Sequence, residues 1–339
     1  MKTKLLFIVS CILAVSIFSC KHEYKKTELP LIEYDILINN YGNNYSWFDH
    51  IEGFQRIELF TILIEGAYSG KYKLEDMEGN KIKVASLDKY FELPPSENSD
   101  SEVVMLMNKD NLNGLRFREK WSINQETGMT EKEVLAICPV HFRHHPLTDG
   151  SDFSEVHPLF WIYPSEQEKK TNEMIVIKNI AYDVYIDNTF TTISGAYEAQ
   201  LPFYFCNIET SLRKEIINII LDAGFEKKTP VYDFFMTPMS DQDMEFLKGQ
   251  KEVVQYEDPE NPEIELDSIR VSTLDRTQIV RFKFIEEWSM DKTSLKFSKQ
   301  VIAMSPFIIS YDEHGECRGL KFLFWIVFDE NRAKSLVFE

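Results

Sequence analysis

Apolar side chains recur at helical spacing in two segments, residues 56–67 and 213–223. The two apolar stripes are Leu59, Phe60, Leu63 and Ala67, and Ile216, Ile217, Ile220 and Ala223. Stripes of this kind are typical of amphipathic helices that bury one face. For the second helix we expect Thr210 or Ser211 as the N-cap and Gly224 as the left-handed residue at the C-terminal end.

After each helix the pattern changes to the two-residue period of a strand. The face shared by alternate residues of the first strand consists of Phe117, Glu119, Trp121 and Ile123. Turn signals at Asn124–Gly128 and Asp291–Ser294 precede further predicted strands at Glu133–Ile137 and Lys299–Met304. Each half therefore reads as a helix followed by an antiparallel β-meander, which is an α+β fold.

Two further features bound these strands. We expect Pro139 and Pro306 to end the strands at 133–137 and 299–304, because proline cannot donate a hydrogen bond to a β-ladder. The nearly continuous apolar run Lys321–Phe328 predicts a central strand that is buried on both faces.

The chain repeats itself, because four blocks occur twice in the same order. Arg56–Glu65, Arg116–Ser122, Leu135–Val140 and Leu159–Ile162 match Arg213–Asp222, Arg281–Ser289, Ile302–Phe307 and Leu323–Ile326. Four collinear matches indicate an internal duplication. We predict two homologous repeats at 28–165 and 175–332, joined by a linker at 166–174.

Two insertions interrupt this plan. Residues 94–100 read as a solvated loop rich in Pro and Ser. Residues 252–267 carry seven acids and no base; they are a candidate for a mobile, tail-like loop, and we favour the alternative, a solvated charged face.

The N-terminus indicates export. Lys2 and Lys4 precede an apolar core at residues 5–18, which is shorter than the roughly 20 residues of a membrane span. The motif Ile17-Phe18-Ser19-Cys20 resembles a bacterial lipobox, in which the cysteine becomes diacylated and N-terminal after cleavage. We predict a signal peptide at 1–19, lipidation of Cys20 and an anchor linker at 20–27. The alternative is a plain secretory signal that ends in a chance cysteine.

Net charge, the absence of catalytic motifs and the cysteine count restrict the possible functions. The 339 residues have a formal net charge of −18, which argues against nucleic-acid binding. No nucleophile elbow, P-loop or dinucleotide fingerprint is present, so we expect neither a catalytic residue nor a cofactor. Beyond Cys20 the exported chain keeps Cys138, Cys206 and Cys317, for which free thiols are the expectation and any disulfide pairing stays open.

Histidine and tryptophan are the remaining candidates for chemistry. The histidines His141, His144, His145 and His157 fall in one predicted loop, and His141 and His145 have an i, i+4 spacing suited to zinc. No cysteine or carboxylate completes a known ligand pattern, so we expect a polar loop and no metal site. The recurring pairs Trp121/Trp288 and Trp161/Trp325 are expected in the core.

The repeated unit resembles the GldN/PorN family of gliding motility and type IX secretion. The similar blocks are Arg281–Asp291 with its Glu-Glu-Trp-x-x-Asp motif, Val301–Pro306, Leu323–Phe328, Ile219–Gly224, Pro230–Asp233, Met236–Met239 and Ile62–Lys71. The resemblance implies a non-enzymatic envelope protein, whose relatives associate with a partner lipoprotein in ring assemblies at the outer membrane. This chain departs from that pattern in carrying its own lipobox and two copies of the unit.

Three functions remain as hypotheses. The first is a structural or protein-interaction component, lipid-anchored to the outer membrane of a Gram-negative bacterium with the periplasmic face expected over the cell surface, and forming oligomeric assemblies. The second is an envelope module that binds a glycan or peptide through exposed aromatic side chains. The third is an envelope hydrolase that uses the histidine-rich loop.

Overall fold

The computed structural model describes residues 24–38, 53–93, 105–146, 152–166, 173–186, 208–258, 261–312 and 314–333. Several predicted features lie outside these residues: the signal at 1–19, Cys20, Cys206 and the loop at 94–100. The two predicted helices form, and the fold is α+β with mostly antiparallel strands, as the sequence indicates.

The first half contains β1 (Lys26–Glu28), β2 (Ile32–Leu37), α2 (Gly53–Tyr68), β3 (Lys73–Glu75), β4 (Glu92–Leu93), β5 (Met105–Leu106), β6 (Gly114–Asn124), β7 (Thr130–Pro146), β8 (Asp152–Pro158) and β9 (Trp161–Tyr163). The second half contains β10 (Met174–Tyr185), α4 (Thr210–Phe225), β11 (Val231–Tyr232), α5 (Asp241–Lys248), β12 (Gly249–Asp258), β13 (Asn261–Thr273), β14 (Ile279–Asp291), β15 (Phe297–Tyr311), β16 (Cys317–Phe322), β17 (Trp325–Val327) and α6 (Glu330–Ala333). Short 3-10 turns lie at Val84–Ser86, Asp88–Phe91, Lys109–Asn111 and Arg276–Gln278. Each half therefore has a strand before its helix, β2 or β10, that the helix-then-meander prediction lacks.

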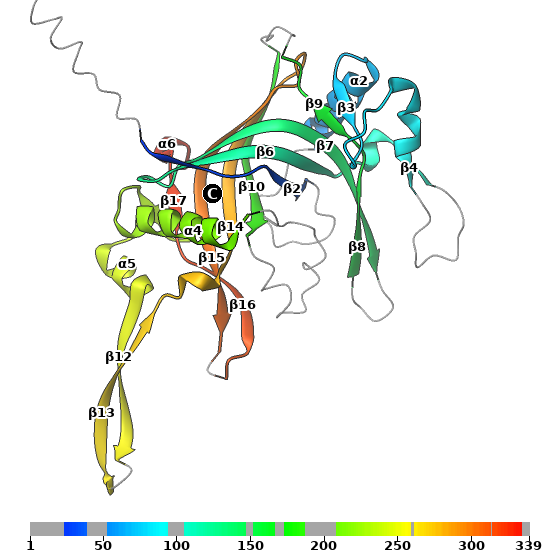
Figure 1. Ribbon diagram of the computed structural model, residues 1–339. Helices are drawn as coiled ribbons and strands as arrows, with labels where there is room; N and C mark the ends of the chain where they lie inside the picture. Colours follow the sequence, from blue (N-terminus) through cyan, green and yellow to red (C-terminus); the bar gives the residue numbers. More distant parts are fainter. Residues whose placement is uncertain are drawn as a thin grey trace, which may run out of the picture.

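One curved sheet runs through both halves (Figure 1). Among the described residues thirteen strands join it, with the central order β1-β6-β7-β15-β14-β10. The strands β7 and β15 meet at the middle, where Lys132 lies opposite Lys299 in the antiparallel register. The predicted boundaries at 28–165 and 175–332 stay a prediction, while the sheet itself is continuous across the two repeats.

The helix of each repeat packs against the other repeat. Lys292, in the turn between β14 and β15, forms an ion pair of 2.6 Å with Glu58 of α2. Gly128, in the turn between β6 and β7, lies so close to α4 that an added Cβ would be 3.1 Å from the Cβ of Ala223. The Thr229 hydroxyl beyond α4 donates to the Thr127 carbonyl at 2.8 Å. Apolar residues of both repeats accordingly form one continuous buried cluster.

The predicted strand ends at Pro139 and Pro306 are wrong, since β7 and β15 continue through both prolines. The carbonyl of Pro139 accepts from the amide of Leu159, and that of Pro306 accepts from the amide of Leu323. In a strand the amide and carbonyl of one residue face the same edge. Each proline therefore lacks its N–H at a point where no partner strand needs it. Beside β7 this point is the gap between β9 and β8, and beside β15 it is the gap between β17 and β16.

Two other predicted segments differ in the structure. The run Lys321–Phe328 does not form one strand, because Leu323 and Phe324 separate β16 from β17 opposite Pro306. Residues 252–258 and 261–267 do not form a loop but belong to the two strands of the antiparallel hairpin β12–β13. This hairpin extends away from the body below α5 (Figure 1).

The caps predicted for α4 are also wrong. Glu209 is the N-cap residue and makes no side-chain cap hydrogen bond, and the left-handed residue after the helix is Lys227 with φ 52°. Gly224 lies inside the last turn instead, where an added Cβ would be 2.5 Å from the ring of Phe324. The glycine is required for close packing and not for backbone conformation.

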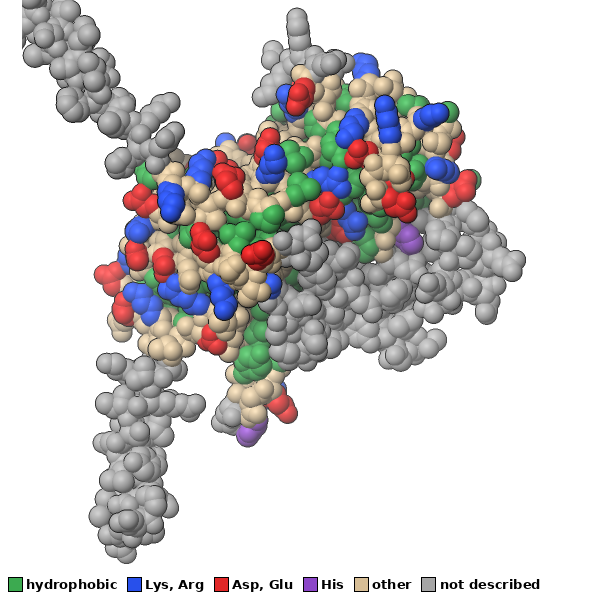
Figure 2. All heavy atoms as spheres, in the orientation of Figure 1, with side chains coloured by type: hydrophobic (Ala, Val, Ile, Leu, Met, Phe, Trp, Pro, Cys, Tyr) green, Lys and Arg blue, Asp and Glu red, His purple; other side chains and the backbone are tan. Residues whose placement is uncertain are grey.

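The face of the molecule drawn in Figure 2 shows no concentration of one charge among the described residues. On the face in Figure 2, Lys and Arg side chains are interspersed with Asp and Glu. Among the described residues, none of the helices has the length and apolar character needed to cross a membrane.

Replacing Gly224 by Ala tests the packing of α4. In an ordinary helix Gly→Ala stabilises by about 1 kcal/mol. Here we expect a loss of about 1–3 kcal/mol in the free energy of unfolding, because the methyl group overlaps Phe324. Urea unfolding measures this loss in four proteins. They are the wild type, Gly224→Ala, Phe324→Leu and the double variant Gly224→Ala/Phe324→Leu. Destabilisation of equal size in both backgrounds would contradict the assignment.

Candidate functional site

Two glutamates lie inside the core at equivalent places of the repeats. Glu119 on β6 and Glu286 on β14 are both fully buried. A tryptophan follows each glutamate by two residues and therefore shares its face of the strand. The indole of Trp121 donates to Glu119 at 2.6 Å, and the indole of Trp288 donates to Glu286 at 2.7 Å.

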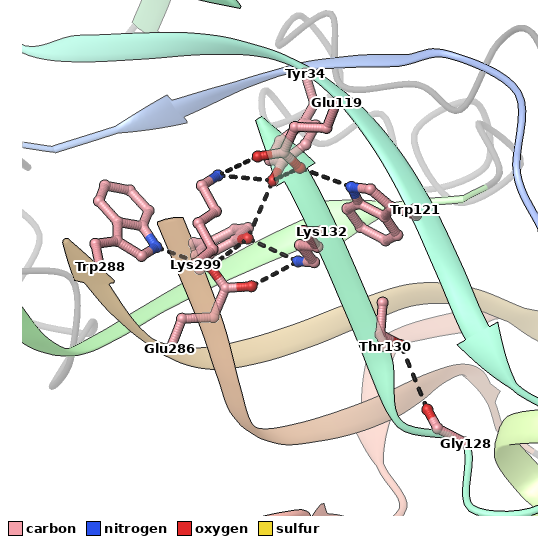
Figure 3. A network of polar contacts seen from close by, with 10 residues as sticks. Tyr34, Glu119, Trp121, Gly128, Thr130, Lys132, Glu286, Trp288 and Lys299 are labelled. Atoms are coloured by element: carbon pink, nitrogen blue, oxygen red, sulfur yellow. Dashed lines mark hydrogen bonds and ion pairs between the residues drawn. The ribbon is translucent and has the colours of Figure 1, made fainter. Parts of the chain in front are cut away.

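The positive partners of these glutamates come from the opposite repeat. Lys299 on β15 forms an ion pair of 2.8 Å with Glu119, and Lys132 on β7 forms one of 2.7 Å with Glu286. All four side chains have no exposed surface. The two ion pairs therefore cross the boundary between the repeats in both directions (Figure 3).

Two tyrosines complete the arrangement, which we call the reciprocal charge network: Tyr34, Glu119, Lys132, Tyr182, Glu286 and Lys299. The Tyr34 hydroxyl donates to Glu119 and the Tyr182 hydroxyl donates to Glu286, each at 2.8 Å. The Lys132 ammonium donates to the oxygen of Tyr182 at 2.8 Å, and the Lys299 ammonium to that of Tyr34 at 2.9 Å. The two tyrosine oxygens lie 3.1 Å apart at the centre.

Aromatic rings enclose the two ammonium groups. The Nζ of Lys132 lies 3.3 Å from the ring centre of Phe284, and the Nζ of Lys299 lies 3.2 Å from that of Phe117. The negative face of an aromatic ring attracts a cation, most strongly where water is excluded. The rings therefore stabilise the buried charges and separate them from solvent.

Burial shifts the pKa values of the network. Burial lowers the pKa of Lys132 to about 8, although Glu286 and Glu119 oppose the shift, and it also lowers the pKa of Lys299. For Glu286, burial alone would raise the pKa, but the ammonium groups of Lys132 and Lys299 outweigh it, so the pKa is lowered. Glu286 is therefore held as a carboxylate.

A second ion pair in each repeat flanks the network. The residue after each tyrosine, Asp35 or Asp183, binds the arginine that opens the repeated strand block. Arg116 contacts Asp35 through two nitrogens at 2.5 and 2.7 Å, and Arg281 lies 3.2 Å from Asp183. In both repeats, the aspartate of the Tyr-Asp pair on β2 or β10 therefore forms an ion pair with the arginine on β6 or β14.

The network is closed to ligands. The cavity beside it, lined by Trp121, Phe284 and Ile220 among others, has a volume of about 10 Å³. That volume holds a single water molecule at most. The two carboxylates and two ammonium groups of the network balance one another. The network therefore joins the repeats and leaves none of these groups free for a substrate.

The predicted histidine loop is a hairpin of β7 and β8. His141 lies opposite His157, with ring centres 6.3 Å apart, and its Nδ1 is 2.7 Å from the carbonyl oxygen of Asn111. His144 and His145 occupy β7 opposite Ser154 and Phe153. Within the described ranges, no group of three His, Cys, Asp or Glu side chains is placed to hold a metal ion.

The tryptophans and cysteines lie as the sequence indicates where the structure describes them. Trp121, Trp161, Trp288 and Trp325 are buried. Cys138 is a buried free thiol, and Cys317 is a half-buried free thiol. Burial raises the pKa of the Cys138 thiol, which therefore stays protonated.

Comparison with known families agrees with the duplication. Residues 35–193 and 184–337 each match the family described as gliding motility associated protein GldN. The chain belongs to the GldN family. The resemblance predicted from the sequence is thus confirmed, with one family unit in each half. No curated protein sequence matches the chain.

Sequence reasoning placed Glu119 on the correct face but missed its partners. The signal was present, because Lys132 and Lys299 precede the matched blocks at 135–140 and 302–307 by the same three residues. The dipeptide Tyr34-Asp35 of the first repeat likewise recurs as Tyr182-Asp183 in the second. A charged residue that recurs among apolar strand positions would have indicated a buried ion pair.

Removing one partner of a crossing ion pair should strongly destabilise the protein. We expect Lys132→Met to lower the free energy of unfolding by about 3–5 kcal/mol, because it leaves the Glu286 carboxylate buried without its cation. Adding Glu286→Gln should restore part of the loss. The control is Lys248→Met, which breaks an exposed pair with Glu245 and should cost under about 1 kcal/mol. Equal losses for Lys132→Met and Lys248→Met in urea unfolding would contradict the role of the network.

The lowered pKa of Glu286 predicts acid sensitivity. A carboxyl whose pKa is lower in the folded than in the unfolded protein stabilises the fold above its unfolded pKa, and that contribution disappears as pH falls through the folded pKa. We expect the free energy of unfolding to fall below about pH 4.5, and to fall less in Lys132→Met/Glu286→Gln. Urea unfolding between pH 7 and pH 3 measures both. An identical pH dependence of the two proteins would show that Glu286 does not contribute.

Proposed function

We propose that this protein is a non-enzymatic, lipid-anchored component of the cell envelope that acts through protein–protein contacts in gliding motility or type IX secretion. The observation that carries the proposal is the match of both halves to the GldN family. A closed, charge-balanced junction between two such units suits a mechanical or scaffolding part, because it resists separation and presents no reactive group.

The proposed anchor is Cys20. Only three residues separate it from Tyr24, where the described chain begins. Four peptide units span at most about 14 Å, so a diacyl group on Cys20 would hold β1 near the membrane surface. We propose the outer membrane as the location, with the body on the periplasmic side and assembled with protein partners.

The glycan part of the second hypothesis is less well supported, whereas the exposed rings of Phe234, Phe235 and Phe246 are compatible with its peptide part. That hypothesis relied on exposed aromatic side chains, and tryptophan is the strongest ring for stacking on sugars. The four described tryptophans are buried in the core. The hydrolase hypothesis relied on histidines that the structure places on a hairpin without a ligand cluster among the described residues.

Fractionation of native envelopes tests the proposed function. We expect the wild-type protein in the outer-membrane fraction, labelled by a palmitate analogue and crosslinked into species larger than a monomer. Cys20→Ser should lose the label and move to the soluble fraction, because its chain has no diacyl group. Cys317→Ser is the matched control and should behave as wild type. Recovery of unlabelled, monomeric wild-type protein would contradict the proposal.

A further inference from the structure

A rigid turn after β11 exposes two adjacent phenylalanines. The carboxylate of Asp233 accepts hydrogen bonds from the amides of Phe235 at 2.9 Å and Thr237 at 2.8 Å. The Asp233 amide also donates to the Thr237 carbonyl at 2.8 Å. Phe234 and Phe235 are nevertheless 54% and 70% exposed. Such exposure of large apolar rings on an ordered turn is typical of a contact surface.

The first repeat contains the same turn without the phenylalanines. Asp76 accepts from the amides of Glu78 and Asn80 at 3.0 and 2.8 Å, and its amide donates to the Asn80 carbonyl. The left-handed position of this turn is Gly79 with φ 86°. Met77 and Glu78 occupy the positions of Phe234 and Phe235. The fold itself therefore does not require aromatic residues here.

The turn of the second repeat includes local backbone strain. Its left-handed position is Met236, with φ 59°, where a residue with a side chain is disfavoured. The Met236 side chain is buried, while the two neighbouring rings are not. The packing of Met236 in the core thus holds the strained turn in a conformation in which both rings face outward.

The exposed rings are ordered by packing. The rings of Phe234 and Phe235 meet edge to face at 5.5 Å, and Phe234 meets Phe322 in the same way at 5.5 Å. Phe322 in turn contacts the buried Trp325 with ring centres 5.7 Å apart. A surface held in one conformation loses little entropy when a partner binds.

A groove of about 270 Å³ separates this turn from α5. Asp233 and Pro238 line it on one side, and Asp243 and Phe246 line it on the other. Phe246 is 58% exposed, so an exposed ring also lies at the α5 side of the groove. We call the three phenylalanines and the groove the aromatic docking surface.

Among the described residues, the groove of the aromatic docking surface is lined by two acids and no base. These are Asp233 and Asp243, whereas the neighbouring Asp241 is paired with Lys227. An acidic surface disfavours a second copy of this chain, whose net charge is −18, and an anionic lipid surface.

We propose that the aromatic docking surface binds a protein segment that carries apolar side chains flanked by Lys or Arg. This inference rests on the proposed function, because it specifies the chemistry of one protein partner. Phe234, Phe235 and Phe246 receive the apolar side chains, and Asp233 and Asp243 of the groove attract the basic ones.

Binding of a defined peptide by the purified full chain tests the chemistry. The probe is a fluorescent peptide of alternating Lys and Leu, and its control alternates Glu and Leu. We expect Phe234→Met/Phe235→Glu, which copies the turn of the first repeat, to weaken binding of the Lys/Leu peptide at least tenfold. The unfolding midpoint should fall only slightly, since Phe235 is mostly exposed and Phe234 loses only its edge-to-face contact with Phe322. Leu106→Ser, at an exposed position elsewhere, should bind as wild type. Equal affinity of all three proteins, or of both peptides, would overturn the proposal.

Photo-crosslinking in cells identifies the partner. A photoreactive residue at position 235 of the lipidated chain should crosslink to a protein whose mapped segment is apolar and basic, and one at position 78 should not. Crosslinks to a second copy, to lipid or to an acidic segment would overturn the proposal. Loss of crosslinking at 235 while large envelope species persist would reject this surface and leave the proposed function intact. If the protein is monomeric in the envelope but still binds the Lys/Leu peptide, the proposed function is rejected and the aromatic docking surface is retained.

Discussion

The pairing of buried charges across the two repeats is the constraint on which the rest of this structure depends. A carboxylate or ammonium group taken out of water is costly unless an opposite charge and hydrogen-bond partners accompany it. Glu119 obtains its cation from the second repeat, and Glu286 obtains its cation from the first. Each repeat alone would bury a carboxylate without its lysine. The two therefore form one cooperative unit, and the crossed packing of α2 and α4 acts in the same direction.

The two copies have kept this junction and diverged at the surface. Tyr, Glu, Trp and Lys occupy equivalent positions of the network in both repeats, with matching distances. Between the helix and the long strands, however, the first repeat has the two-residue strands β4 and β5, whereas the second has α5 and the long hairpin β12–β13. The turns at Asp76 and Asp233 share their hydrogen bonds but differ in the residues they expose. A tandem repeat can specialise one copy in this way, because the other continues to supply half of the core.

This division of roles fits a protein that acts by holding other proteins. The interior is filled by aromatic rings around a balanced set of charges, and the cavity beside them has no room for a ligand. The proposed partner contacts lie on the outside, where the ordered phenylalanines of the turn after β11 form the proposed contact surface of the second repeat. A membrane anchor at Cys20 would attach the chain at the β1 end, while β12–β13 extends away from the body (Figure 1).

Local sequence determined the elements of this protein. Apolar periodicity located α2, α4 and the buried face of β6, and repeated blocks identified the duplication and the family, because these signals depend on neighbours along the chain. Tertiary structure decided which atoms meet. Gly224 looked like a helix cap but makes room for Phe324, and Pro139 and Pro306 lie within strands because the adjacent strand is interrupted there. The crossing of Lys132 and Lys299 to the opposite glutamates depends on how two repeats pack, since the desolvation of a charge is set by three-dimensional burial and not by position in the sequence.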